Sequence, residues 1–292
     1  MNKEIWPNFF IVGAMRAGTT SLYEYLKKSK FVYLPSIKEP NYFTSAVDPK
    51  QLLTKPIKDE KKYLELFKNV KNEKVIGDSS PTYLWDPKSA EMIYKKIPNA
   101  KIIIILRNPI ERAFSHYLML FGRGMTKLSF EQVIKESLMV SGDNFEGRVI
   151  SGGFYFKQIK RYLDTFPKNQ NKIIIFEEFA NNTKKSVQDV LNFLEIDDSP
   201  HESVNTIYNQ YTEPRGGISS SIMRSNKIKK FGKKILPSSL GQSMMNDVLG
   251  KKVEKPKLSE KLRTILEDIY REEIIEIEKI LDIDVQWLKK KA

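Results

Sequence analysis

Short apolar runs separated by helical stretches constrain the fold of this chain more than any other feature. The runs lack the alternation of polar and apolar residues that a half-exposed strand shows, so each is expected to be a strand buried on both faces. They cover residues 9–12, 31–34, 74–78, 101–106 and 172–176. Helical patterns cover residues 19–29, 109–122, 153–166 and 258–281. Strands that alternate with helices predict an α/β fold with a central, mainly parallel five-stranded sheet flanked by helices.

The first predicted strand leads into the segment GAMRAGTTSL, residues 13–22, which has the glycine spacing of a phosphate-binding loop. Gly13 and Gly18 let the backbone approach an anion, and the helix that follows presents unpaired N–H groups at its positive end. An ATP-binding loop has a lysine where this chain has Thr19, and Arg16 is the only cation of the segment. We therefore expect a P-loop-like three-layer fold that binds a nucleotide without a γ-phosphate. A nucleotide kinase or NTPase with a degenerate loop is the alternative.

A second anion-binding pattern follows the fourth predicted strand. Arg107 comes directly after this strand, and Ser115 lies two turns into a helix that Pro109 starts. A guanidinium and a hydroxyl at this separation can hold one phosphate from two sides, although Arg107 could equally pair with Glu111 or cap a neighbouring element. Right-handed crossovers bring the ends of parallel strands to one edge of a sheet, so we expect the two loops to share a ligand site.

The composition limits the kinds of site and partner. The chain has 292 residues without a linker or repeat, so we expect one domain over residues 1–292. It has no cysteine and only two histidines, His116 and His201, which argues against a metal site and fits a reducing compartment. The net charge of +13 favours an anionic ligand or surface, but no nucleic-acid-binding motif is present. Without an apolar signal or membrane-spanning run, the protein is expected to be soluble and cytoplasmic.

Together these motifs resemble the sulfotransferase family that uses 3′-phosphoadenosine 5′-phosphosulfate (PAPS), in particular its bacterial, carbohydrate or heparan-sulfate, and tyrosine branches. The segment GAMRAGTTSL is similar to the family's 5′-phosphosulfate loop, and LRNPIERAFSHY is similar to its 3′-phosphate motif. Further similar segments are KEPNYF, SPTYLW, GFYFKQIKRYLDTFP and EPRGG. The resemblance implies that PAPS is the sulfuryl donor, that 3′-phosphoadenosine 5′-phosphate (PAP) is the product, and that no metal takes part.

The resemblance also implies which residues bind the donor. They are Arg16, Ala17, Gly18, Thr19, Thr20, Ser21, Arg107, Ser115, Tyr155, Arg215 and Gly216. Arg16 stands at the position of the family's loop cation, where the tyrosine-type branch also has arginine. Because the donor presents a sulfuryl group on a 5′-phosphate and has no γ-phosphate, the absence of a lysine at Thr19 is consistent with this family.

Three residues are expected to be catalytic. Arg16 is placed to stabilise the charge that develops on the departing phosphate oxygen. By resemblance to glycosaminoglycan-type relatives, Glu39 in KEPNYF is the expected general base, and Asp78 is the competing carboxylate. Some relatives have a lysine one position after this acidic residue, where this chain has Ser79. Lys38, which precedes Glu39, is expected to be solvated.

No recognised pattern specifies the acceptor. A hydroxyl or amine of a small molecule, a carbohydrate or another acceptor is expected to bind through insertions near residues 44–72, 120–150 and 218–257. The basic segment 223–236 has apolar residues at helical spacing beneath its cations. This pattern fits an acceptor-site lid, a groove for an anion, a helix on a membrane surface or a solvated helix. A binder of anionic polymers without catalysis is the second alternative function.

Overall fold

The computed structural model describes residues 4–45, 52, 54–139, 147–202 and 256–288. These residues contain one five-stranded sheet in the order β2-β3-β1-β4-β5, and each pair of neighbouring strands is parallel. The strands are β1 (Phe9–Gly13), β2 (Val32–Tyr33), β3 (Val75–Ser79), β4 (Lys101–Leu106) and β5 (Asn171–Ile175). The predicted α/β class and five-stranded sheet are confirmed.

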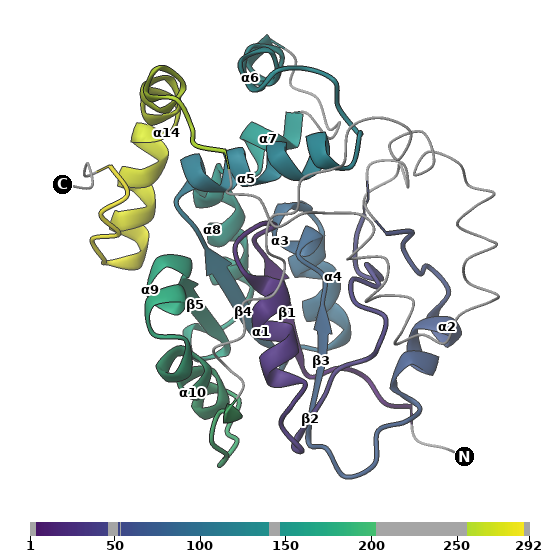
Figure 1. The fold of residues 1–292 in the computed structure, drawn as a ribbon. Helices are drawn as coiled ribbons and strands as arrows, with labels where there is room; N and C mark the ends of the chain where they lie inside the picture. The colour runs from purple at the N-terminus through teal and green to yellow at the C-terminus, as the bar shows by residue number, and fades with distance from the viewer. Residues whose placement is uncertain (1–3, 46–51, 53, 140–146, 203–255, 289–292) are drawn as a thin grey trace.

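Helices cover both faces of this sheet (Figure 1), which explains why its central strands are apolar throughout. Every residue of β1 is buried, and so is every residue of β4 after Lys101. One group of helices comprises α1 (Thr19–Leu26), α9 (Phe176–Asn181) and α10 (Thr183–Phe193), in which α10 packs against the other two. The other group comprises α3 (Thr82–Trp85), α4 (Ser89–Lys96) and α8 (Tyr155–Thr165). The sheet is therefore the middle layer of three.

The remaining helices extend this core. They are α2 (Glu60–Leu64), α5 (Pro109–Gly122), α6 (Phe130–Met139), α7 (Gly147–Ser151) and α14 (Glu260–Leu281), with short 3-10 helices η2 (Glu65–Phe67) and η3 (Lys168–Gln170). The C-terminal α14 packs against α5 and α8. The Ser259 side chain caps it by accepting a hydrogen bond from the Leu262 N–H. Because α14 buries Leu266, Tyr270 and Ile274, it belongs to the core.

The carboxyl ends of β1, β3 and β4 lie at the same edge of the sheet because these neighbouring strands are parallel. The loop after β1 is tied to β4 by a hydrogen bond of 2.7 Å from the Ala14 N–H to the Ile105 carbonyl. At the end of β4, the Asn108 side chain caps α5 by accepting from the Ile110 N–H at 2.9 Å. The fold thus brings the two predicted anion-binding loops together.

Several predictions from the sequence concern residues that the structure does not describe. Arg215, Gly216 and the basic segment 223–236 lie outside the described residues, as do nearly all of the expected insertion at 218–257 and short parts of those at 44–72 and 120–150. The single-domain organisation with acceptor-side insertions stays a prediction. Among the helices of the described residues, none is long and apolar enough to cross a membrane.

Candidate active site

The loop between β1 and α1 ends in the uncapped start of a helix. Gly18 precedes α1 with a φ of 94°, and no side chain caps this helix end. The first N–H groups of α1 are therefore available to an anion in the loop. A Cβ atom added to Gly18 would lie 2.9 Å from Phe176 Cδ2. Both the left-handed backbone and the lack of space require glycine here.

Arg16 joins the two predicted anion-binding motifs. Its backbone is left-handed, with a φ of 68°. Its side-chain Nε donates to Ser115 Oγ at 3.3 Å, so the loop after β1 contacts the second turn of α5. Burial, and after it the charge of Arg107, lowers the pKa of Arg16 to about 10. The guanidinium is still charged at neutral pH, and a bound anion would offset both effects.

Arg107 is held beside this loop by contacts on its side chain and its backbone. Its Nη1 donates to the Arg16 carbonyl at 3.2 Å, and its guanidinium carbon lies 4.7 Å from the centre of the Phe176 ring. The Tyr155 hydroxyl donates to the Arg107 carbonyl at 3.1 Å. Burial lowers the pKa of Arg107, and its Nε has no hydrogen-bond partner among the described residues. These features fit a guanidinium that binds an acidic ligand.

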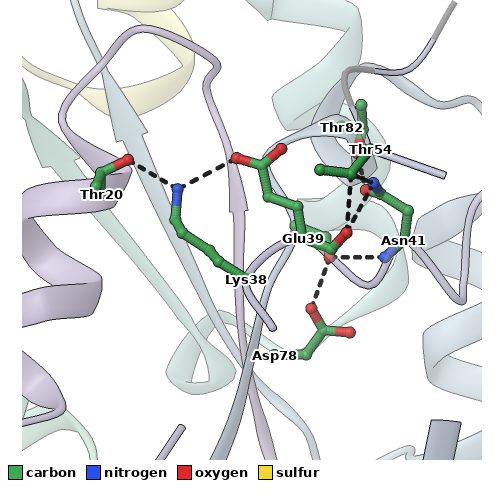
Figure 2. A network of polar contacts seen from close by, with 8 residues as sticks. Thr20, Lys38, Glu39, Asn41, Thr54, Asp78 and Thr82 are labelled. Carbon is green, nitrogen blue, oxygen red and sulfur yellow. Dashed lines mark hydrogen bonds and ion pairs between the residues drawn. The ribbon is translucent and has the colours of Figure 1, made fainter. Parts of the chain in front are cut away.

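Glu39 lies on a loop with an unusual backbone next to the end of β3. Its φ is 62° although proline follows it, and Asn41 is also left-handed with a φ of 53°. The Glu39 N–H donates to the Ser79 carbonyl at 3.1 Å. The Glu39 carbonyl accepts hydrogen bonds of 3.0 Å from Asn41 Nδ2 and from Thr54 Oγ1 (Figure 2). This network holds a strained backbone in one place, as is common at functional sites.

The structure contradicts the prediction that Lys38 is solvated. Its Nζ donates to Thr20 Oγ1 at 2.8 Å and lies 3.2 Å from Glu39 Oε1. Only 20% of the side chain is exposed. Lys38 was not predicted as a site residue, because a single lysine in a loop belongs to no periodic pattern. Only the folded chain brings it to the start of α1.

Asp78 is fully buried at the end of β3. Its carboxylate accepts hydrogen bonds from the hydroxyls of Tyr63, Ser80 and Tyr83, at 2.8, 2.7 and 2.9 Å. Ser80 Oγ in turn accepts from the Asn41 N–H at 3.1 Å. Burial raises the pKa of Asp78 to about 6, because loss of water outweighs the three hydroxyl donors. Asp78 is thus connected to the loop of Glu39 through Ser80.

His116 and the predicted donor-binding residue Tyr155 occupy buried positions. His116, next to Ser115, is 1% exposed and its Nδ1 lies 3.4 Å from Arg112 Nη1. Burial, reinforced by the charge of Arg112, holds the pKa of His116 well below its usual range. Tyr155 is fully buried, and its hydroxyl is directed at the backbone of Arg107.

The geometry described above occurs in a chain whose residues 7–279 match the model of the sulfotransferase domain family. The chain belongs to the sulfotransferase family. This membership confirms the resemblance to PAPS-dependent sulfotransferases that the sequence motifs indicate. It also favours sulfuryl transfer over the alternative of a nucleotide kinase or NTPase.

Individual relatives support the same assignment. The chain is 24% identical over 245 residues to human carbohydrate sulfotransferase 15, a match that covers 65% of this chain and 44% of the relative. It is 24% identical over 301 residues to mouse bifunctional heparan sulfate N-deacetylase/N-sulfotransferase 4, covering 96% of this chain and 31% of the relative. This chain therefore spans less than half the length of these curated relatives.

A solved structure resembles this one over nearly its full length. It is a sulfotransferase from Alicyclobacillus acidocaldarius, with a TM-score of 0.73 and 27% sequence identity. The similarity covers 98% of this chain and 100% of that protein. The fold class predicted from the sequence is thus that of a solved member of the family.

Proposed function

We propose that this protein transfers the sulfuryl group of PAPS to a hydroxyl or amine of its acceptor, without a metal. The observation that carries the proposal is the hydrogen bond from Arg16 to Ser115, because it joins the loop after β1 to the motif after β4. Arg16 and Arg107 both have a pKa lowered by burial, so the site favours anionic ligands. A nucleotide with acidic groups at its 5′ and 3′ positions suits two adjacent cationic elements.

The proposed donor site has two parts. The loop and the first turn of α1, from Arg16 to Ser21, would bind the 5′-phosphosulfate with a guanidinium, hydroxyls and backbone N–H groups. Arg107 and Ser115 would bind the 3′-phosphate, and Tyr155 would support Arg107 through its carbonyl. Arg215 and Gly216 are assigned to the same phosphate by resemblance alone. When bound, PAPS supplies a sulfuryl group attached to a phosphate leaving group.

The proposed transfer is a single in-line displacement. The acceptor oxygen or nitrogen forms a bond to sulfur while the bond from sulfur to the 5′-phosphate oxygen breaks. Glu39 takes the proton of the acceptor, and Arg16 stabilises the charge that remains on the phosphate. Glu39 is 23% exposed, so its carboxylate can reach a bound molecule.

Asp78 is the less suitable base. Both of its oxygens already accept hydroxyl hydrogen bonds, and the side chain has no exposure to a bound acceptor. We propose that Asp78 positions Glu39 through Ser80 and Asn41, whose N–H donates to the Ser80 hydroxyl.

For the acceptor we propose a carbohydrate. The human and mouse relatives are named for carbohydrate and heparan sulfate substrates. The net charge of +13 would attract an anionic polysaccharide. We also propose a cytoplasmic location, because a sequence without cysteine suits a reducing compartment.

The change Glu39→Gln tests the proposed base. We expect it to leave the affinity for PAP unchanged and to lower the rate of PAP formation from PAPS by about 10² to 10⁴, the usual effect of removing a general base. The rate is measured by chromatography of the nucleotides, with N-deacetylated heparan sulfate as a trial acceptor and with water alone.

A matched control is available on α4. Glu91 pairs with Lys95 on an open surface, where 64% of the Glu91 side chain is exposed, so Glu91→Gln should change neither quantity. Turnover of Glu39→Gln at the wild-type rate would exclude Glu39 as the base. If the wild-type protein forms no PAP with either acceptor, the proposed function is wrong.

A further inference from the structure

Lys38 lies between the proposed donor loop and the proposed base. Figure 2 shows its ammonium group reaching from the loop of Glu39 toward Thr20 on α1, with contacts of 2.8 Å to Thr20 Oγ1 and 3.2 Å to Glu39 Oε1. The Lys38 and Glu39 side chains are only 20% and 23% exposed. An ion pair on an open surface contributes little, but this lysine is largely withdrawn from water and directed at a helix end.

The charges around Lys38 are arranged for an anion. Thr20 is the second residue of α1, whose positive end has no side-chain cap. An ammonium group beside a positive helix end is unfavourable unless negative charge is present. Glu39 supplies such charge in the structure described here. The ammonium group has three N–H donors, and Thr20 and Glu39 use two of them, so a further acceptor can be bound.

We propose that Lys38 is a catalytic residue that binds the phosphate oxygen from which the sulfuryl group departs. The inference rests on the proposed function and deepens it. As the acceptor bonds to sulfur, the electron pair of the broken sulfur–oxygen bond stays on the 5′-phosphate oxygen of PAP. Glu39 receives the acceptor proton. Lys38 keeps its own protons and stabilises the new charge on that oxygen by a charge-assisted hydrogen bond.

A purely positional role is the competing explanation. Lys38 could act by holding the carboxylate of Glu39 and have no contact with the donor. The two roles differ in their effect on product binding, because only the proposed contact distinguishes nucleotides with and without a 5′-phosphate. They also differ when Glu39 is already neutral, since a purely positional lysine then has no carboxylate to hold.

Binding of nucleotides provides the first test. Lys38→Met is expected to weaken PAP binding by roughly 10-fold to 100-fold, the effect of losing one charge-assisted hydrogen bond. Binding of adenosine 3′-monophosphate, which has no 5′-phosphate, should be unchanged. Lys38→Arg should recover much of the PAP affinity. Lys95→Met, which removes the partner of the exposed Glu91, should behave as wild type. Equal PAP affinity in wild type and Lys38→Met would overturn the proposal.

Turnover provides the second test, with PAPS as donor and water as acceptor. Lys38→Met should lower the rate of PAP formation by about 10²-fold, as loss of one donor to a developing oxyanion does. The same factor should appear when Lys38→Met is added to Glu39→Gln. No further loss in this double variant would assign Lys38 a positional role only and overturn the inference, while the sulfotransferase proposal would stand. If wild type neither binds PAP nor consumes PAPS, both proposals fall together.

Discussion

The Asp78 carboxylate accepts three hydroxyl hydrogen bonds, yet its pKa is raised to about 6 because it is fully buried. An unfolded aspartate titrates near 3.8. Between these two values the folded protein holds a proton that the unfolded chain has released. The contribution of Asp78 to stability is therefore fully present below the pKa of the unfolded chain. It decreases as the pH rises and levels off above the pKa of the folded protein.

Asp78→Asn removes this titration. Compared with the variant, the wild-type protein is expected to lose roughly 2–3 kcal/mol of unfolding free energy between about pH 4 and pH 7. Urea unfolding of both proteins across this pH range measures the difference between their unfolding free energies. The other titrating groups are the same in both proteins, so their contributions cancel. If the wild type instead gained stability relative to the variant as the pH rose, the hydroxyl donors would outweigh burial in their effect on the pKa of Asp78.

The sequence predicted some site residues better than others. Arg107 directly follows β4 and Arg16 lies in the loop that starts where β1 ends, so their place at the sheet edge follows from topology. Lys38 lies in a loop with no repeating pattern, and its direction depends on hydrogen bonds between Glu39, Ser79 and Thr54 that link distant segments. Such contacts form only in the folded chain, which is why the sequence could not identify Lys38.

The turn from β1 into α1 depends on Gly18, and Gly18→Ala tests this element. We expect a loss of roughly 2–4 kcal/mol of unfolding free energy, because the new methyl group adds a clash with Phe176 to the strain of a left-handed backbone. PAP affinity should fall as well, since the helix end is displaced. Urea unfolding and calorimetric titration measure the two effects.

Gly124 provides a matched control in the loop after α5. Its φ is 65°, and a Cβ atom there would have no neighbour within 4 Å. Gly124→Ala should therefore cost only the backbone strain, about 1–2 kcal/mol, and leave PAP affinity unchanged. Equal losses in the two variants would show that the contact with Phe176 is unimportant.

Most of the elements that form the sheet could be predicted because their apolar runs are long and uninterrupted. The observed β4 coincides with the predicted run at residues 101–106, and β5 differs by one residue at each end. The edge strand β2 is shorter than predicted, with two residues, because it pairs on one side only, with β3. Of the described helices, α1, α5, α8 and α14 were predicted. The others, mostly short, were not: α2, α3, α4, α6, α7, α9 and α10.

The folded molecule concentrates positive charge that the sequence distributes along its whole length. Arg16, Lys38 and Arg107 belong to three separate segments, and the parallel sheet brings the ends of these segments together. Arg112 and Arg123 also lower the pKa of Arg16. A net charge of +13 alone indicates only an anionic partner, whereas this arrangement supports the proposed place at which that partner binds.

Calorimetric titration with PAP in the presence of EDTA tests most directly whether this edge is a metal-independent donor site. We expect the wild type to bind PAP about 100-fold more tightly than ADP, which lacks a 3′-phosphate, and Arg107→Ala to remove most of this preference. Arg271→Ala, on the exposed surface of α14, is the control. Equal affinity of the wild type for PAP and ADP, or PAP binding that requires magnesium, would show that this edge is not a metal-independent donor site.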